Sequence, residues 1–236
     1  MKEKVFLSSN GTGTAGIIKN DLLKNLFEKF SINFEDIVDI INSNHGSRFN
    51  ERQSYGIFIK SIPSNPSDSN KDFVLTEVSL DREGNDSSKK GRVDFFIFYR
   101  NWLLLVELKL VRTGITTKDG SDYKIIVKKW EEAKKQIESI PVDNNPVLNE
   151  FVDRLKAKGI VKIPMMIIVY HENDDKNGNY FSDNDANEYL TDKVNDLESK
   201  IKPQYGYFTS INNKHSLNLG NDRFRRIRGI SFFANS

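Results

Sequence analysis

Residues 91–112 read GRVDFFIFYRNWLLLVELKLVR, and this stretch decides the fold. Two runs rich in Val, Ile, Leu and aromatic residues flank Arg100-Asn101, which predicts two adjacent antiparallel strands joined by a tight turn. Asp94 interrupts the first run, and Glu107 and Lys109 interrupt the second. An unpaired carboxylate is costly to bury, so three ionisable groups in so apolar a hairpin indicate a specific role.

The length of the turn sets which residues of the two strands face each other. A turn of two residues, or of the four residues 99–102, places Asp94 opposite Glu107, with Cβ atoms about 4.5–5.5 Å apart. A turn of three or five residues would set Asp94 diagonal to Glu107 instead. Lys109 lies two residues beyond Glu107 and therefore emerges on the same face of its strand.

Two carboxylates at that separation repel each other, and a divalent cation between them would turn the repulsion into chelation. Mg²⁺ typically takes one or two carboxylates and fills its other positions with water and phosphate oxygens. The ammonium group of Lys109 beside such an ion would stabilise charge on an attacking water or on a phosphate. The sequence therefore predicts a Mg²⁺ site, which Mn²⁺ would also fill, between the two strands.

This pattern of Asp followed by Glu-x-Lys across a hairpin resembles the motif of the PD-(D/E)XK nuclease superfamily, with Val93 replacing the proline of the family name. The resemblance covers about residues 48–170. It implies an α/β protein with a restriction-endonuclease-like αβββαβ core, in which helices flank a mixed central sheet. In that family the matching Asp and Glu bind Mg²⁺ and the matching Lys assists the water, which implies these roles for Asp94, Glu107 and Lys109.

The resemblance also implies roles for residues outside the hairpin. Glu51 lies in the first turn of an expected helix that Ser47 would cap and that ends near Ile62. It matches an acidic residue that helps to bind the metal in many of these families, and it is equally well explained as a first-turn glutamate that the helix dipole favours. Glu77, on an expected strand over 73–80, competes with Glu51 as third acid. Gln136, on an expected helix over 123–140, matches a Gln that points toward the site, or is a polar neighbour of the buried stripe.

Two groups of basic residues are candidates for contact with a nucleic-acid backbone. The first group, directly before Asp94, comprises Lys89, Lys90 and Arg92. It also fits a solvated hairpin tip. The second and densest group comprises Arg223, Arg225, Arg226 and Arg228. It would either clamp phosphates or protect an edge strand from aggregation.

The remainder of the chain predicts one domain with a helical extension. Its 236 residues are enough for one good core or two small ones, of which one is preferred, and a composition of 37% hydrophobic and 29% charged residues is that of a globular protein. Helical periodicity over 17–30 and 34–42 predicts a pair of helices within an N-terminal extension, residues 1–45, ahead of a nuclease-like domain, residues 46–236. We expect further helices over 146–158 and 183–201, and strands over 160–170, 204–211 and 227–234.

Three further features bear on cofactors and compartment. Residues 11–16, GTGTAG, match a dinucleotide-binding turn, but the strand before them is weak, and a flexible Gly/Thr loop is the preferred interpretation. The chain has no cysteine, which suits a reducing cytoplasm. There is neither a signal-peptide core nor an apolar run near the ~20 residues of a membrane span, so we expect a cytoplasmic protein without a membrane partner.

These features predict a Mg²⁺-dependent nuclease, a hydrolase that cleaves phosphodiester bonds with a metal-activated water. Asp94, Glu107 and the backbone carbonyl of Leu108 would hold the ion. The superfamily acts mostly on DNA, which favours DNA over RNA, and cutting both strands of a duplex would favour a homodimer. The alternative is a catalytically inactive nucleic-acid-binding or regulatory module on the same fold, although such a module need not retain buried charges that cost stability.

Overall fold

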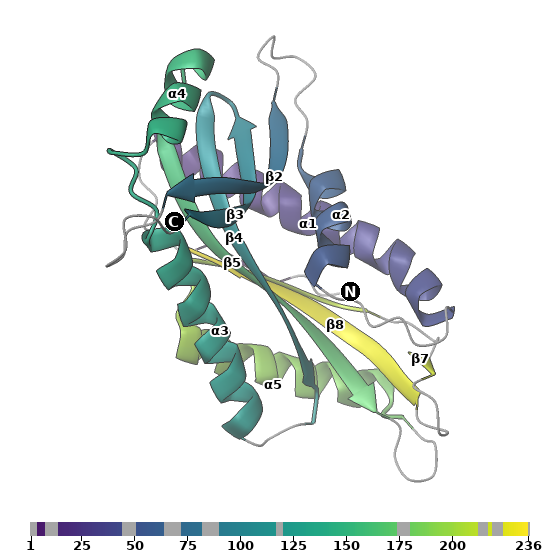
Figure 1. Ribbon diagram of the computed structural model, residues 1–236. Coiled ribbons are helices and arrows are strands. Elements are labelled where there is room, and N and C mark those ends of the chain that lie inside the picture. Colours follow the sequence, from purple (N-terminus) through teal and green to yellow (C-terminus); the bar gives the residue numbers. More distant parts are fainter. Residues whose placement is uncertain are drawn as a thin grey trace. The chain divides into compact units, whose positions relative to one another are not determined.

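The computed structural model is an α/β structure built on a mixed sheet (Figure 1). It describes residues 4–7, 14–43, 51–63, 72–81, 90–116, 120–173, 180–211, 217–218 and 224–235. The strands are β1 (Lys4–Leu7), β2 (Phe73–Asp81), β3 (Lys90–Tyr99), β4 (Trp102–Gly114), β5 (Ile160–Asn173), β6 (Tyr205–Ser210), β7 (Leu217–Asn218) and β8 (Phe224–Ala234). The helices are α1 (Thr14–Ser43), α2 (Glu51–Ser61), α3 (Gly120–Glu138), α4 (Pro146–Leu155) and α5 (Asp183–Ile201).

The chain forms two compact units. The first, called here the hairpin unit, comprises Ser64–Lys109, Lys128–Met166 and Ala234–Ser236. The second, called the α1 unit, comprises Met1–Pro63, Leu110–Val127 and Ile167–Phe233. The expected boundary between an extension and a nuclease-like domain, after residue 45, lies outside the described residues.

The hairpin unit is organised by β2, β3 and β4, which pair in that order and antiparallel. The β3–β4 ladder runs from Tyr99↔Trp102 to Phe95↔Val106. Both turn residues, Arg100 and Asn101, have positive φ angles, 48° and 63°, as a two-residue type I′ turn requires. The expected hairpin with its two-residue turn is therefore confirmed.

Strands β4 and β5 are neighbours that run parallel, which makes the sheet mixed. Near the start of β4, the N–H of Leu103 donates to the carbonyl of Gly159 at 3.0 Å. Just after the end of β4, the N–H of Ile115 donates to the carbonyl of His171 at 2.8 Å. The two residue numbers rise together along the strands, as only a parallel pair allows. The continuous apolar run of β5 predicted such a strand, since parallel strands are buried on both faces.

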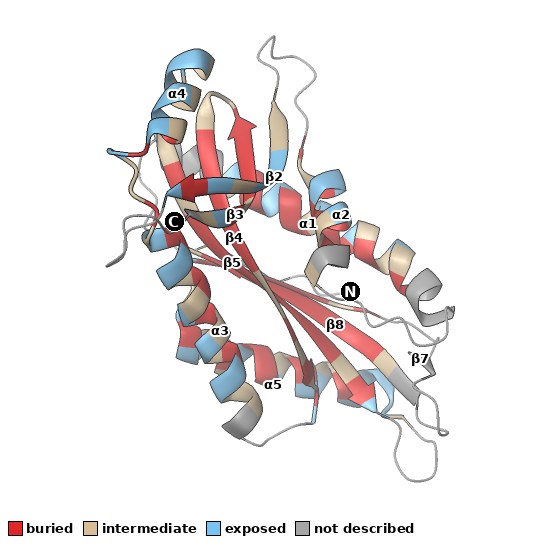
Figure 2. Ribbon diagram, viewed as in Figure 1, coloured by how far each residue is buried: buried red, intermediate tan, exposed pale blue. Residues whose placement is uncertain are grey.

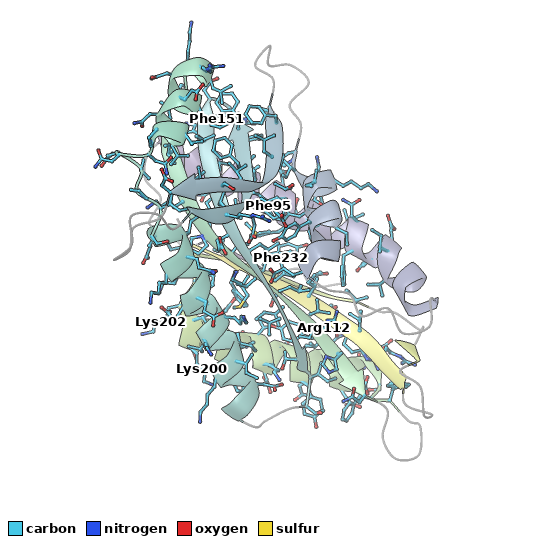
Figure 3. All side chains as sticks on the ribbon, in the orientation of Figure 1. Phe95, Arg112, Phe151, Lys200, Lys202 and Phe232 are labelled. Atoms are coloured by element: carbon cyan, nitrogen blue, oxygen red, sulfur yellow. The ribbon has the colours of Figure 1, made fainter. Side chains whose placement is uncertain are left out.

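One buried cluster of the hairpin unit lies on one face of the hairpin. Phe96 and Phe98 of β3 alternate onto this face, and Leu103 and Leu105 of β4 join them in a buried cluster. Ile137 of α3, Leu148 of α4 and Ile140, which lies between the two helices in the sequence, cover the cluster. The ring of Phe151 on α4, labelled in Figure 3, lies 4.5 Å from that of Phe96 between centroids. Glu107 and Lys109 continue the alternation of Leu103 and Leu105, so the hairpin directs both toward the helices.

Two glycine substitutions test this packing. A Cβ atom at Gly159 would lie 2.9 Å from ring carbon Cζ3 of Trp102, so Gly159→Ala should lower the free energy of unfolding by about 1–3 kcal/mol. Gly56 of α2 is the matched control, because its Cβ would meet nothing within 4 Å. Gly56→Ala should raise stability by about 0.5–1 kcal/mol. Urea denaturation measures both, and equal effects would contradict the placement of Trp102.

In the α1 unit, the sheet has helices on both faces. Its strands follow the order β1-β6-β8-β5, with β7 paired to β8. The ring of Phe27 of α1 stacks on Phe232 of β8 and that of Phe30 meets Phe232 edge-to-face, with centroids 4.8 and 5.1 Å apart. Leu190 of α5 lies 3.4 Å from the Cβ position of Gly229, on the opposite face. Most of β8 is consequently buried (Figure 2).

Helix α1 is one helix of 30 residues, not the pair of helices that the sequence predicted. The expected break fell at residues 31–33, Ser-Ile-Asn, which include neither Gly nor Pro. The hydroxyl of Ser31 donates to the carbonyl of Phe27 at 2.9 Å, so this polar side chain is satisfied inside a continuous helix. Among the described residues, no helix is both long and apolar enough to cross a bilayer.

A polar cluster ties α5 of the α1 unit to the end of β4 and the start of α3. The ammonium of buried Lys193 donates to the carbonyl of Gly114, and burial lowers the pKa of this lysine. The ammonium of Lys200, labelled in Figure 3, lies 3.9 Å from the ring centroid of Tyr123. Burial, helped by a hydrogen bond to Asp196, raises the pKa of Tyr123 to about 12. These polar groups pair with one another, so we interpret the cluster as a stabilising contact within the α1 unit.

Arg228 forms a buried ion pair, which differs from both roles expected for the C-terminal basic cluster, phosphate binding and protection of an edge strand. Its guanidinium is 2% exposed and donates to Glu172 at 2.6 Å, to Asp183 at 2.7 Å and to the carbonyl of Phe181 at 2.8 Å. Strand β8 lies between β6 and β5, so it is not an edge strand. Arg226 lies 4.1 Å from the ring centroid of Tyr180. The side chains at 223 and 225 lie outside the described residues.

Candidate metal and phosphate site

Asp94 lies at a break in the hairpin unit. The β2–β3 ladder runs through Thr76↔Phe95 and resumes at Val78↔Val93, so Glu77 and Asp94 are skipped. Glu77 has a φ of 53°, which is strained for a residue with a side chain. Strands β2 and β3 both bend in this region (Figure 1).

The carboxylate of Asp94 makes the connection to β4 that the backbone ladder no longer makes. The ladder ends at Phe95↔Val106, and the next position of this register sets Asp94 opposite Glu107, as a two-residue turn predicts. There Oδ2 of Asp94 accepts the backbone N–H of Leu108 at 2.7 Å. This charge-assisted bond fixes the carboxylate beside the strand that carries Glu107 and Lys109.

Glu107 and Lys109 form a buried ion pair on β4. Oε1 of Glu107 lies 2.9 Å from Nζ of Lys109, and the two side chains are 4% and 12% exposed. Two opposite charges two residues apart lie on one face of a strand, so the pair is local and forms without a distant partner. Desolvating two charges costs several kcal/mol per ion, and a hydrophobic pair at these positions would be at least as stable. Stability alone therefore does not explain why these positions are charged.

The two candidates for a third acidic group have different surroundings. In the α1 unit, Glu51 begins α2, and its Oε2 accepts the backbone N–H of Leu110 at 3.2 Å. In the hairpin unit, Glu77 is exposed and pairs with Arg92, with 2.9 Å between Oε2 and Nη1. Within the described part of the chain, no three acidic or histidine side chains are close enough together to hold a metal ion.

Helix α3 contributes a carboxylate that the sequence did not single out. Glu132 pairs with Lys129 at 2.9 Å and with Lys128 at 4.0 Å. The hydrogen bond from Lys129 lowers the pKa of Glu132, and the charges of Lys128 and Lys109 act in the same direction. Gln136 is exposed, and it lies one turn after Glu132 on the same side of α3. The four-residue spacing between Glu132 and Gln136 is the feature of the sequence that could have predicted that Glu132 lies on the same side of α3 as Gln136.

The basic residues expected to contact nucleic acid are only partly described. Lys89 lies outside the described residues, and so does the side chain of Lys90, the first residue of β3. Arg92 is exposed and pairs with Glu77. Residues 11–13 of the dinucleotide-binding pattern also lie outside the described residues, whereas residues 14–16 form the start of α1 and not the expected loop.

The residues beside the hairpin have the chemistry of a magnesium site. Asp94 and Glu107 supply two carboxylates, and the strand between Glu107 and Lys109 supplies the carbonyl of Leu108, so all three ligand atoms would be hard oxygens. Mg²⁺ needs no more than two protein carboxylates, because water and phosphate complete its octahedron.

Comparison with known proteins adds no identification to this geometry. No protein-family model, curated protein or solved structure matches the chain.

Proposed function

We propose that the protein is a Mg²⁺-dependent nuclease that hydrolyses phosphodiester bonds of nucleic acid, with DNA as the expected substrate. The observation that carries the proposal is the buried Glu107–Lys109 pair beside the carboxylate of Asp94. The element order α2-β2-β3-β4-α3-α4-β5 supports a restriction-endonuclease-like core, with α4 as an insertion before the last strand.

Each residue has a defined task in this reaction. Asp94, Glu107 and the carbonyl of Leu108 would bind the cation, while the amide of Gln136 would be a polar group beside it. The cation supplies charge neutralisation at the phosphate and makes water a better nucleophile near neutral pH. The ammonium of Lys109 orients the water and stabilises the negative charge that develops on phosphorus-bound oxygens. Water adds to phosphorus, the bond to the leaving oxygen breaks, and that oxygen takes up a proton.

Metal affinity gives one test of this assignment. Asp94→Asn and Glu107→Gln each remove a charged ligand and should weaken Mn²⁺ binding at least about tenfold, since even changes outside the ligand set commonly have effects of that size. Asp81→Asn is a suitable control, because Asp81 is an exposed carboxylate at the end of β2 in the same unit. Calorimetric titration measures the affinities, and unchanged binding in both site variants would remove the proposed site.

Cleavage is the direct test of the function. The protein is incubated with supercoiled, linear and single-stranded DNA, and with RNA, in Mg²⁺ or Mn²⁺, and with EDTA in parallel. We expect metal-dependent cleavage of DNA that EDTA abolishes.

A nucleic-acid-binding module without turnover is the second candidate, and one observation favours it. Glu107 and Lys109 already neutralise each other, so the pair is complete without a cation. Nucleic-acid binding without cleavage in any metal would support the module and reject the nuclease.

A further inference from the structure

Trp130 of α3 has a buried hydrogen-bond donor without an acceptor. Its side chain is 0% exposed, and its indole Nε1 has no hydrogen-bond partner among the described residues. An indole nitrogen can only donate, so an acceptor must come to it. A buried donor that stays unpaired costs about 1–3 kcal/mol, and such donors are rare in folded proteins. The surroundings of Trp130 decide which acceptor it can meet.

Two contacts show how α3 runs along β4. In the α1 unit, the hydroxyl of Thr113 donates to Oδ2 of Asp122 at 2.8 Å. In the hairpin unit, Ile137 belongs to the buried cluster that contains Leu105. From the first contact to the second, the residue numbers rise along the helix and fall along the strand, so the two elements run antiparallel. A helix that connects two parallel strands, here β4 and β5, is expected to run in this direction.

Both contacts give the same level for Trp130 along β4. Trp130 lies eight residues after the first contact, about 12 Å of helix, which is the length of between three and four residues of a strand. It lies seven residues before the second contact, about 10.5 Å of helix or about three residues of a strand, and on the same buried side as Ile137. Counted from opposite ends of β4, the two lengths meet at about residues 108–109. Glu107 and Lys109 point toward α3 there, so the side chain of Trp130 lies beside their ion pair.

We propose that Trp130 is a positioning residue for Glu107, whose carboxylate accepts the indole N–H of Trp130 when a divalent cation is bound. Without a cation, Oε1 of Glu107 lies 2.9 Å from Nζ of Lys109, and the indole has no acceptor. With a cation held by Asp94 and Glu107, the carboxylate leaves the ammonium and becomes the acceptor that the indole lacks. A hydrogen bond of this kind fixes the orientation of a metal ligand. This role rests on the proposed function for its cation, but it does not require turnover.

The indole N–H signals in the NMR spectrum of the protein, labelled with nitrogen-15 at tryptophan, test this contact directly. The chain has two tryptophans, and the spectrum of Trp102→Phe identifies the signal of Trp130. We expect saturating Mg²⁺ to shift the Trp130 proton downfield, because a hydrogen bond to a carboxylate deshields it. The Trp102 proton should shift less, since Trp102 lies five strand residues, about 16 Å, from Glu107. A Trp130 signal that is unchanged or moves upfield, while calorimetry shows Mg²⁺ bound, would overturn the role.

Calorimetric titration with Mn²⁺ gives a second readout. Trp130→Phe removes the donor and should weaken Mn²⁺ binding at least about tenfold, as the loss of groups that orient metal ligands commonly does. Trp102→Phe is the matched control, because it removes the other indole of the hairpin unit, whose Nε1 also has no partner among the described residues. This control should bind Mn²⁺ as the wild type does. If Trp130→Phe fails to fold, the spectrum of the wild type still decides the question.

The outcomes separate this role from the proposed function. Cleavage of DNA with wild-type Mn²⁺ affinity in Trp130→Phe would reject the positioning role and keep the nuclease. The downfield shift and the weakened Mn²⁺ binding, without cleavage of any substrate, would support the role and reject the nuclease. A wild-type protein that binds no divalent cation would reject both.

Discussion

Replacing Lys109 with Met is expected to lower the rate of cleavage by about 10²–10³-fold while Mn²⁺ binds at least as tightly as to the wild type. The rate falls because the ammonium that stabilises developing charge is lost. Metal affinity is kept because the same ammonium, 2.9 Å from Oε1 of Glu107, competes with a cation for that carboxylate. Glu107→Gln should behave differently, because this variant should lose both cleavage activity and metal affinity.

The stability of the same variant is a second readout. Without metal, Lys109→Met removes the ammonium that pairs with the buried carboxylate of Glu107, which should cost about 3–5 kcal/mol. Saturating Mn²⁺ should therefore raise the melting temperature of Lys109→Met more than that of the wild type, since a ligand that binds only the folded state stabilises it. Lys109→Gln keeps a polar group at this position, so it provides the same test if Lys109→Met fails to fold. Retained cleavage, or a smaller Mn²⁺ shift than in the wild type, would contradict the competition.

The largest loss of stability in the α1 unit is expected from Arg228→Met. Arg228 and Glu172 are each 2% exposed, and removal of one charge leaves the other buried. The backbone N–H of Phe181 also donates to Glu172, but it cannot neutralise the carboxylate. We expect a decrease of about 3–5 kcal/mol in the free energy of unfolding, measured by urea denaturation.

Two further variants separate the buried charge from a general packing effect. Arg228→Met/Glu172→Leu removes both charges, so it should recover much of the loss, because a well-packed apolar pair is often as stable as a buried ion pair. Lys200→Met breaks the exposed pair with Asp196, whose side chains are 41% and 42% exposed, and should cost less than about 1 kcal/mol. An effect of Arg228→Met as small as that of Lys200→Met would show that the guanidinium is not buried with Glu172.

Local pattern was sufficient to predict the hairpin. Apolar runs on both sides of Arg100-Asn101 predicted the strands, and the two-residue turn predicted the register that sets Asp94 opposite Glu107. The same kind of signal predicted β5, and it predicted α5 at its observed bounds. These elements were predictable because hydrophobic period and turn length act between residues close in the sequence.

Contacts between distant residues were not predictable. Arg228 is 56 residues from Glu172, and a charged residue in a basic cluster is ordinarily a surface residue. The charge of Lys109 influences the pKa of Glu132 because α3 packs on the hairpin. The positive φ of Glu77 had no signal either, since Gly and Asn favour that conformation and Glu does not.

Anomalous scattering from a crystal grown with Mn²⁺ tests most directly whether a divalent cation binds between Asp94 and Glu107. We expect an anomalous peak about 2.1 Å from carboxylate oxygens of both residues, with Oε1 of Glu107 no longer paired to Nζ of Lys109. A Glu107–Lys109 pair that stays at its 2.9 Å separation under saturating Mn²⁺, with no peak between the two carboxylates, would contradict the proposed cation site.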